Sequence, residues 1–143
     1  KLLHKCYRDK VGFLKLIPIA LGEMTGEKEK SELICQAYDY AGIANGYIDD
    51  LIDFEEDLNL LSDTRLICGL KESHNKKLFL KNYIKNAIQF NNLAAELFNK
   101  QKSYKWKNHC DYQSKGCAIL ITLLNTFDFN YILKNSSKYL KGT

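Results

Sequence analysis

Helical periodicity runs through almost the whole chain, and it constrains the fold more than any other feature. Apolar residues recur at i, i+3, i+4 spacing, the repeat that gives a helix one apolar face. The 143 residues contain a single proline, Pro18, and no apolar run alternates with polar residues over the length of a strand. We therefore expect an all-α fold, a helical bundle in which residues 1–143 form one domain with no long linker.

The ends of the expected helices follow from the apolar repeat and from residues that cap helices. The first helix is predicted to kink at Pro18, because proline lacks the backbone N–H that a helix interior uses. Ser62 or Asp63 can cap the third helix, and Ser73 or Asn75 can open the fourth. The predicted helices span about residues 2–24, 30–58, 64–71, 75–100, 110–124 and 130–140.

Composition excludes several classes of protein. No run approaches the roughly 18 uninterrupted apolar residues of a membrane span, so we expect no span. The net charge of +4 comes largely from scattered lysines, which does not indicate binding to nucleic acid. Five cysteines without a CxxC pair predict reduced thiols and a cytoplasmic location, and we expect no targeting leader.

An acidic cluster at residues 48–57 is the strongest functional signal, with six acids within nine positions. Asp49, Asp53 and Asp57 stand at i, i+4 and i+8, which places them on one side of a helix, with Asp50 beside them. Stacked carboxylates repel one another and favour a cation. Mg²⁺ suits this donor set, whereas the alternating ligands of a calcium loop are absent. The alternative is a solvated acidic face without a ligand.

Two glycines continue the same side of the helix before the acids. Gly42 and Gly46, with Asn45, leave that side almost bare, and glycine inside a helix costs roughly 1 kcal/mol against alanine. A packing or functional reason is therefore expected. The sequence predicts a cavity beside the glycines, next to the carboxylates.

Two blocks of residues resemble the C-terminal half of the trans-isoprenyl diphosphate synthases, the polyprenyl synthase family. The block 7–14 with the glycines that follow it is similar to the family's lysine-threonine helix. The block 42–53 is similar to the family's second aspartate-rich motif, DDxxD, with its apolar lead-in. About forty residues separate the two blocks, as in the family. The resemblance implies part of an isoprenoid-synthase-type fold, and we expect the chain to be the C-terminal part of a larger synthase.

The resemblance also implies roles for particular residues. Asp49, Asp50 and Asp53 would hold Mg²⁺, Lys10 would be the catalytic contact to an allylic diphosphate, and Gly46 would face the same group. Diphosphate departure leaves an allylic cation, so metal ions and a lysine must neutralise the leaving oxygens. Isopentenyl diphosphate then attacks, and a longer polyprenyl diphosphate forms.

A second set of residues is expected near the hydrocarbon part of such a substrate. Phe13 and Leu14, with Ile17, are the candidates for an apolar slot that binds the substrate tail. Their alternative role is ordinary core packing. The family's members commonly dimerise, so the resemblance also implies a homodimer or association with a complementary N-terminal half.

The chain departs from the family's pattern at several points. Val11 replaces a threonine, and Asn45 and Gly46 replace a Phe-Gln pair. The loop 59–63 is too short for the family's glycine-lysine segment, and the first aspartate-rich motif is absent from the 143 residues. We therefore expect the chain to be inactive by itself. The alternatives are a fragment of a class I terpene synthase, and a non-catalytic synthase-like subunit or helical interaction module.

Overall fold

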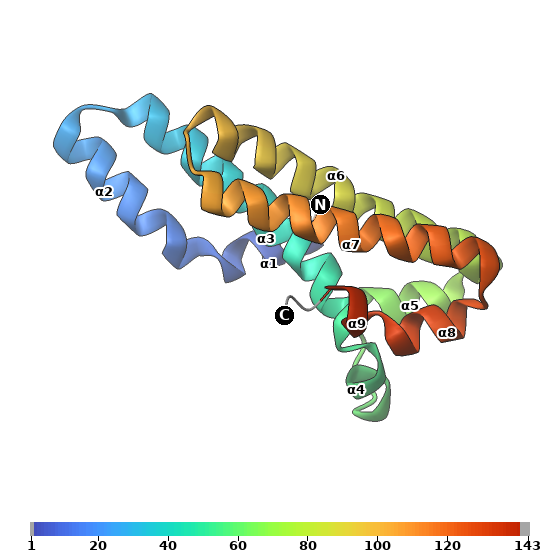
Figure 1. Cartoon of the computed structure of the whole chain (residues 1–143). Helices are drawn as coiled ribbons and strands as arrows, with labels where there is room; N and C mark the ends of the chain where they lie inside the picture. Colours follow the sequence, from blue (N-terminus) through green and yellow to red (C-terminus); the bar gives the residue numbers. More distant parts are fainter. Residues whose placement is uncertain (1, 141–143) are drawn as a thin grey trace.

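The computed structural model describes residues 2–140 and confirms the all-α class, because these residues form helices and no strand (Figure 1). In chain order the helices are α1 (Leu2–Lys10), the 3₁₀ helix η1 (Gly12–Lys15), α2 (Leu16–Thr25), α3 (Lys28–Ile52), α4 (Phe54–Asn59), α5 (Arg65–Glu72), α6 (Lys76–Lys100), α7 (Tyr104–Thr126), α8 (Phe129–Asn135) and α9 (Ser137–Leu140).

Three long helices form the centre of the bundle. α6 packs along both α3 and α7, and these two interfaces are the most extensive in the described part of the chain. α1 and α2 lie along α3, whereas α8 and α9 close the opposite end of the bundle against α7, α4 and α3 (Figure 1). The acidic segment of the chain therefore lies where α3 leaves the bundle and α4 begins.

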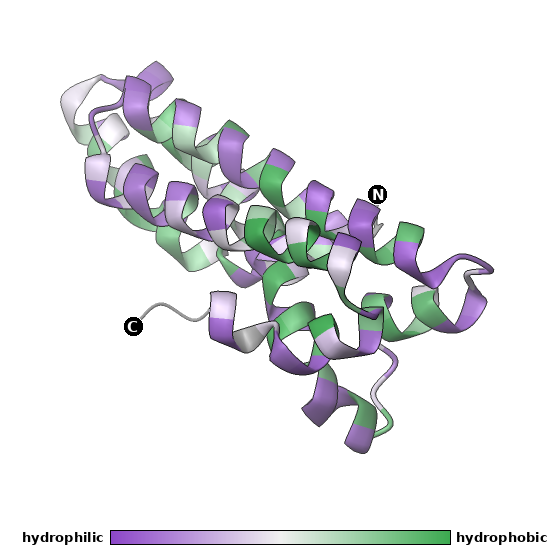
Figure 2. Cartoon of the chain, turned by 45° about the vertical axis from the view of Figure 1, so that its right-hand side comes forward, coloured by the Kyte–Doolittle hydropathy of each residue, from purple (hydrophilic) through white to green (hydrophobic). Residues whose placement is uncertain are grey.

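The core consists of two apolar clusters. The larger one joins α3, α6, α7 and α8, and its fully buried members include Tyr47, Leu51, Ile84, Leu120 and Ile132. The smaller cluster is built around Phe98, which packs against Tyr38 and Trp106. Along the long helices hydrophobic residues alternate with hydrophilic ones, as expected when one face of each helix is buried (Figure 2).

Two predicted helix boundaries are wrong for identifiable reasons. The first helix breaks at Val11 and Gly12, not at Pro18. Pro18 lies in the first turn of α2, where a backbone N–H has no partner within the helix, so proline fits without a kink. The second helix ends at Ile52, and Asp53 separates it from α4.

Helix caps explain the other ends. The Oγ1 atom of Thr64 accepts a hydrogen bond from the backbone N–H of Ile67, so Thr64 caps α5 in place of Ser62 or Asp63. The Oδ1 atom of Asn75 accepts from the N–H of Leu78 at 2.9 Å, which confirms Asn75 as the start of α6. α7 begins at Tyr104, earlier than the sequence predicted.

Among residues 2–140, no helix combines the length and apolar character that crossing a membrane requires. All five cysteines are free thiols. Burial raises the pKa of Cys110 to about 11 and that of Cys117 to about 12, so both thiols are protonated at neutral pH.

Candidate functional site

The acidic segment spans the junction of α3 and α4. Asp49 and Asp50 occupy the last turn of α3, Asp53 is the junction residue, and Asp57 lies in α4. The N–H of Asp53 donates to the Asp49 carbonyl at 2.9 Å, and the N–H of Asp57 donates to the Asp53 carbonyl at 2.8 Å. Helical hydrogen bonding therefore continues across the junction, which keeps these three acids close to the predicted i, i+4, i+8 alignment.

The three predicted metal ligands differ in their surroundings. Asp49 and Asp53 are exposed, whereas Asp50 is half-buried. The Oδ2 atom of Asp50 accepts hydrogen bonds from the hydroxyls of Tyr7, at 2.8 Å, and Tyr83. Burial raises the pKa of Asp50, and the two hydroxyls oppose that rise. Asp50 thus points into the bundle, and only Asp49 and Asp53 present open carboxylates.

Tyr7 and Tyr83 bring Asp50 to the meeting point of α1, α3 and α6. Burial is the largest cause that raises the pKa of both tyrosines, and the Asp50 charge raises it further. Both hydroxyls therefore remain protonated and donate to the carboxylate at neutral pH. These hydrogen bonds hold the end of α3 against α1 and α6, because a hydrogen bond to a charged group contributes roughly 1.5–3 kcal/mol to stability.

Arg65, at the start of α5, extends this cluster. Its guanidinium group donates to the Tyr47 hydroxyl and lies 5.0 Å from the centroid of the Tyr47 ring. The Nε2 atom of His4 lies 3.0 Å from the same hydroxyl. The sequence did not indicate a role for Arg65 or Tyr83, because their contacts join helices that are far apart in the chain. The only local sequence signal for this cluster was the i, i+3 spacing of Tyr47 and Asp50.

Lys10, the predicted catalytic lysine, lies at the end of α1 and is exposed. Its Nζ atom lies 5.9 Å from the centroid of the Tyr7 ring. Desolvation by neighbouring atoms raises the pKa of Asp49, although the residue is exposed, and the positive charge of Lys10 opposes that rise. The charges of Asp53 and Asp50 act in the same direction as desolvation. The charge of Lys10 therefore acts on Asp49 from a neighbouring helix, without an ion pair within 4.0 Å among the described residues.

The predicted cavity beside the glycines is wrong. A Cβ atom added to Gly46 would lie 2.3 Å from the Cγ and Cδ1 atoms of Tyr7, and one added to Gly42 would lie 2.5 Å from a methyl carbon of Val11. These glycines let α1 and the turn after it approach α3 closely. The Tyr7 ring occupies the surface of Gly46 that was expected to face a diphosphate, so Gly46 is not open to a substrate.

Phe13 and Leu14 lie in η1, away from the acids. Phe13 is exposed, as is Ile17, so core packing is wrong for both. Leu14 and Ile17 line an apolar groove of about 420 Å³ between α2, the start of α3 and the start of α7. Tyr38 is the lining residue of α3 closest in sequence to Asp49, and the 11 positions between them correspond to about 16 Å along the helix. The structure does not bring this groove and the acidic segment together.

The donor set can be compared with the needs of Mg²⁺. Within the described range 2–140, no three side chains of His, Cys, Asp or Glu form a group that could hold a metal ion. Asp49 and Asp53 are two exposed carboxylates, and proteins commonly hold Mg²⁺ with one or two carboxylates while phosphate oxygens and water complete the octahedron. The residues therefore fit a Mg²⁺ ion that arrives with a diphosphate, and they do not fit one that the protein alone must hold.

Comparisons with protein-family profiles, curated proteins and solved structures found no match to this chain. The α3–α4 junction presents two exposed carboxylates and, from α1, one lysine, which are groups suited to electrostatic contacts with a cation or an anion.

Proposed function

We propose that this chain binds a Mg²⁺-diphosphate group at Asp49, Asp53 and Lys10, and that it takes part in prenyl transfer from an allylic diphosphate to isopentenyl diphosphate. One observation supports this proposal above the others. The positive charge of Lys10, on α1, acts on the carboxylate of Asp49, at the end of α3, and both side chains are exposed, as is Asp53. A solvated acidic face needs no lysine from another helix.

Each residue has a distinct task in this proposal. The carboxylates of Asp49 and Asp53 provide oxygen ligands for the metal ion. Lys10 neutralises a diphosphate oxygen as the bond to the allylic carbon breaks. Bound Mg²⁺ would supply the remaining charge neutralisation on the leaving group. Asp50, engaged by two tyrosine hydroxyls, positions the end of α3 and does not act as a ligand.

Prenyl transfer also requires groups that these 143 residues do not contain. Two carboxylates and one lysine cannot surround a diphosphate, and the family's first aspartate-rich motif is absent from these residues. We therefore propose that activity depends on a further polypeptide segment that places a second set of carboxylates opposite Asp49. On this view the chain is part of an isoprenoid-synthase-type fold in the cytoplasm.

Calorimetry with inorganic pyrophosphate tests the binding step. We expect pyrophosphate to bind only when Mg²⁺ is present, and we expect Asp49→Asn and Lys10→Gln each to weaken binding by tenfold or so, the effect of about 1.4 kcal/mol. Glu55→Gln is the matched control, because Glu55 is an exposed acid of the same segment that the proposal does not use. Equal binding with and without Mg²⁺, or an equal effect of Glu55→Gln, would count against the site.

A non-catalytic role is the second candidate, because the Tyr7 ring fills the space that the sequence assigned to a ligand. In that case the chain is a synthase-like subunit or helical interaction module, and wild-type protein binds no pyrophosphate. A class I terpene synthase differs in another way. Turnover of an allylic diphosphate by the assembled protein would then be independent of isopentenyl diphosphate, whereas prenyl transfer requires it.

A further inference from the structure

The apolar groove of about 420 Å³ between α2, the start of α3 and the start of α7 is not used by the site at the α3–α4 junction. Ile34 and Tyr38 of α3 and Trp106 of α7 form part of its lining. The lining residues of η1 and α2 recur at i, i+3, i+4, i+7, i+8 and i+11, the spacing of one helical face. They are Leu14, Ile17, Pro18, Leu21, Gly22 and Thr25.

The dimensions of the groove fit a single thin chain. From Leu14 to Thr25 the lining extends over 11 positions, which correspond to about 16 Å along a helix. Division of the volume of about 420 Å³ by this length leaves a mean cross-section of about 26 Å². An α-helix needs about 80 Å², and a peptide strand needs about 50 Å². An unbranched hydrocarbon chain fits, because carbon atoms in contact are 3.5–4.0 Å apart and such a chain occupies only about 20 Å².

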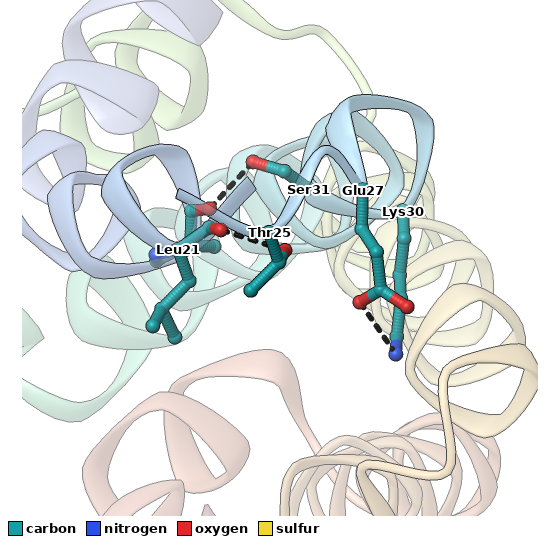
Figure 3. Close-up of polar contacts among 6 residues, drawn as sticks. Leu21, Thr25, Glu27, Lys30 and Ser31 are labelled. Carbon is teal, nitrogen blue, oxygen red and sulfur yellow. Dashed lines mark hydrogen bonds and ion pairs between the residues drawn. The ribbon is translucent and has the colours of Figure 1, made fainter. Parts of the chain in front are cut away.

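The charged residues of the lining lie at one end of the groove. Glu27 and Lys30 form an ion pair there at 3.1 Å, and the other lining residues among positions 2–140 are uncharged. Figure 3 shows this end, with the ion pair on one side of Thr25 and Leu21 on the other. The opposite end of the lining in α3 is Tyr38. The groove therefore suits an amphiphile whose polar head lies at Lys30 and whose apolar chain extends along α2.

The electrostatics of this end favour a head group with a single negative charge. The charge of Lys30 is already balanced by Glu27, so the groove has no surplus of positive side chains for the several charges of a diphosphate. Glu27 and Ser103 precede α3 and α7, and in the described structure neither side chain caps its helix. Both residues line the groove, and the free N–H groups at the start of a helix favour a nearby anion. A carboxylate head meets both conditions.

The hydroxyl groups of the lining do not oppose an apolar chain. The Ser31 hydroxyl donates to the Pro18 carbonyl at 2.7 Å, and the Thr25 hydroxyl donates to the Leu21 carbonyl at 2.8 Å. Both donors are satisfied within the protein, so hydrocarbon that covers them leaves no unpaired donor. Ile17 and Leu21 expose 69 and 53 % of their surface to water, and a bound chain would cover the part that faces the groove.

We propose that this groove binds a long-chain carboxylate, with the hydrocarbon chain along α2 and the carboxylate at Lys30. An extended chain advances about 1.2 Å per bond, so about 13 bonds fill a length of about 16 Å. The best fit is therefore a saturated acid of about 12–14 carbons. The proposal does not rest on the proposed function, because about 16 Å of α3 separates the lining residue Tyr38 from Asp49.

The fluorescence of Trp106 measures binding directly, because this residue is the only tryptophan of the chain and lines the groove. We expect a saturable change with dodecanoate below its micellar concentration. The affinity should rise by up to about fourfold for each methylene from octanoate to dodecanoate, and it should level off beyond tetradecanoate. Dodecanol should bind about tenfold more weakly, and dodecyltrimethylammonium more weakly still. An affinity that keeps rising to octadecanoate, or equal binding of the three dodecyl compounds, would refute the proposal.

Two pairs of variants test where the ligand lies. Lys30→Gln should weaken dodecanoate about tenfold and leave dodecanol unchanged. Lys28→Gln is its matched control, because both lysines lie in the first turn of α3 and pair with a glutamate, but Lys30 lines the groove and Lys28 does not. Leu21→Asn should weaken both ligands more than Leu78→Asn, since both leucines expose 53 % of their surface and Leu21 lines the groove. Equal effects within either pair would contradict binding in this groove.

Competition separates this groove from the proposed diphosphate site. Mg²⁺ with pyrophosphate should leave the affinity for dodecanoate unchanged, whether or not pyrophosphate binds at Asp49. Displacement of dodecanoate by Mg²⁺-pyrophosphate, or tighter binding of an allylic diphosphate of 15 carbons than of tetradecanoate, would assign the groove to the prenyl substrate and contradict the proposal. A Trp106 signal that responds to lipid vesicles but not to dodecanoate would show that the occupant is a membrane.

Discussion

Replacing Gly46 with alanine distinguishes a filled space from an open one. The Cβ atom of the new residue would lie 2.3 Å from the Cγ and Cδ1 atoms of Tyr7. Carbon atoms in contact are separated by about 3.5–4.0 Å, so α1 must move by about 1 Å or more. Because Tyr7 also donates to Asp50 at 2.8 Å, the movement weakens that hydrogen bond.

The magnitude follows from three contributions. Overpacking typically costs about 1–3 kcal/mol, and loss of a hydrogen bond to a charged group costs about 1.5–3 kcal/mol. The better helix propensity of alanine returns about 1 kcal/mol. We therefore predict that Gly46→Ala lowers the free energy of unfolding by roughly 2–4 kcal/mol. For a chain of this size the Tm should fall by about 5–15 °C.

Thermal unfolding followed by circular dichroism measures this change. Gly12→Ala is the control, because an added Cβ atom at Gly12 meets nothing within 4 Å. We expect its Tm to stay within about 2 °C of the wild type, since surface substitutions usually change stability by less than about 0.5 kcal/mol. If Gly46→Ala instead raised the Tm, the space beside Gly46 would be open, and the conclusion that Tyr7 fills it would be wrong.

Three further predictions concern polar and charged side chains. Both polar side-chain atoms of Asn91 are buried without a hydrogen-bond partner. Asn91→Leu should therefore raise the free energy of unfolding, measured by urea titration, by about 1–3 kcal/mol. A decrease would mean that these atoms have a partner in solution. Tyr83→Phe removes the hydroxyl that donates to the Asp50 carboxylate, and it should lower the free energy of unfolding by about 1.5–3 kcal/mol. An unchanged free energy of unfolding would mean that the Tyr83–Asp50 hydrogen bond does not form. The pKa of Asp49 is raised in the folded state, so its ionisation opposes folding as pH rises above about 4. Asp49→Asn should therefore be more stable than the wild type at pH 7 in metal-free buffer, with the difference vanishing below pH 4 or so; a difference that persists there would have another origin.

Local sequence signals were sufficient for most of the fold. The apolar repeat and the single proline predicted the helical class, and Asn75 was one of two predicted starts for α6. The break at Asp53 also had a local signal, since aspartate is a preferred residue before a helix and acids favour its first turn. The continuous acidic repeat suggested one helix because helical hydrogen bonds do continue across the junction.

The interior of the site could not be predicted from local signals. A glycine at i and another at i+4 indicate that something approaches the helix closely, but they do not distinguish a ligand from another helix. The ring that fills the space belongs to Tyr7, nearly forty residues earlier, and only the packing of α1 on α3 brings it there. The inward direction of Asp50 has the same origin, because its partners Tyr7 and Tyr83 lie on different helices.

Paramagnetic broadening by Mn²⁺ tests the proposed site most directly, because this ion can take the place of Mg²⁺ and broadens the amide signals of nearby residues. With pyrophosphate present, we predict selective loss of amide signals at residues 49–53 and around Lys10, and recovery of those signals in Asp49→Asn. Broadening that is independent of pyrophosphate, or that centres on Glu55 and Glu56 and persists in Asp49→Asn, would contradict a metal-diphosphate site at the α3–α4 junction.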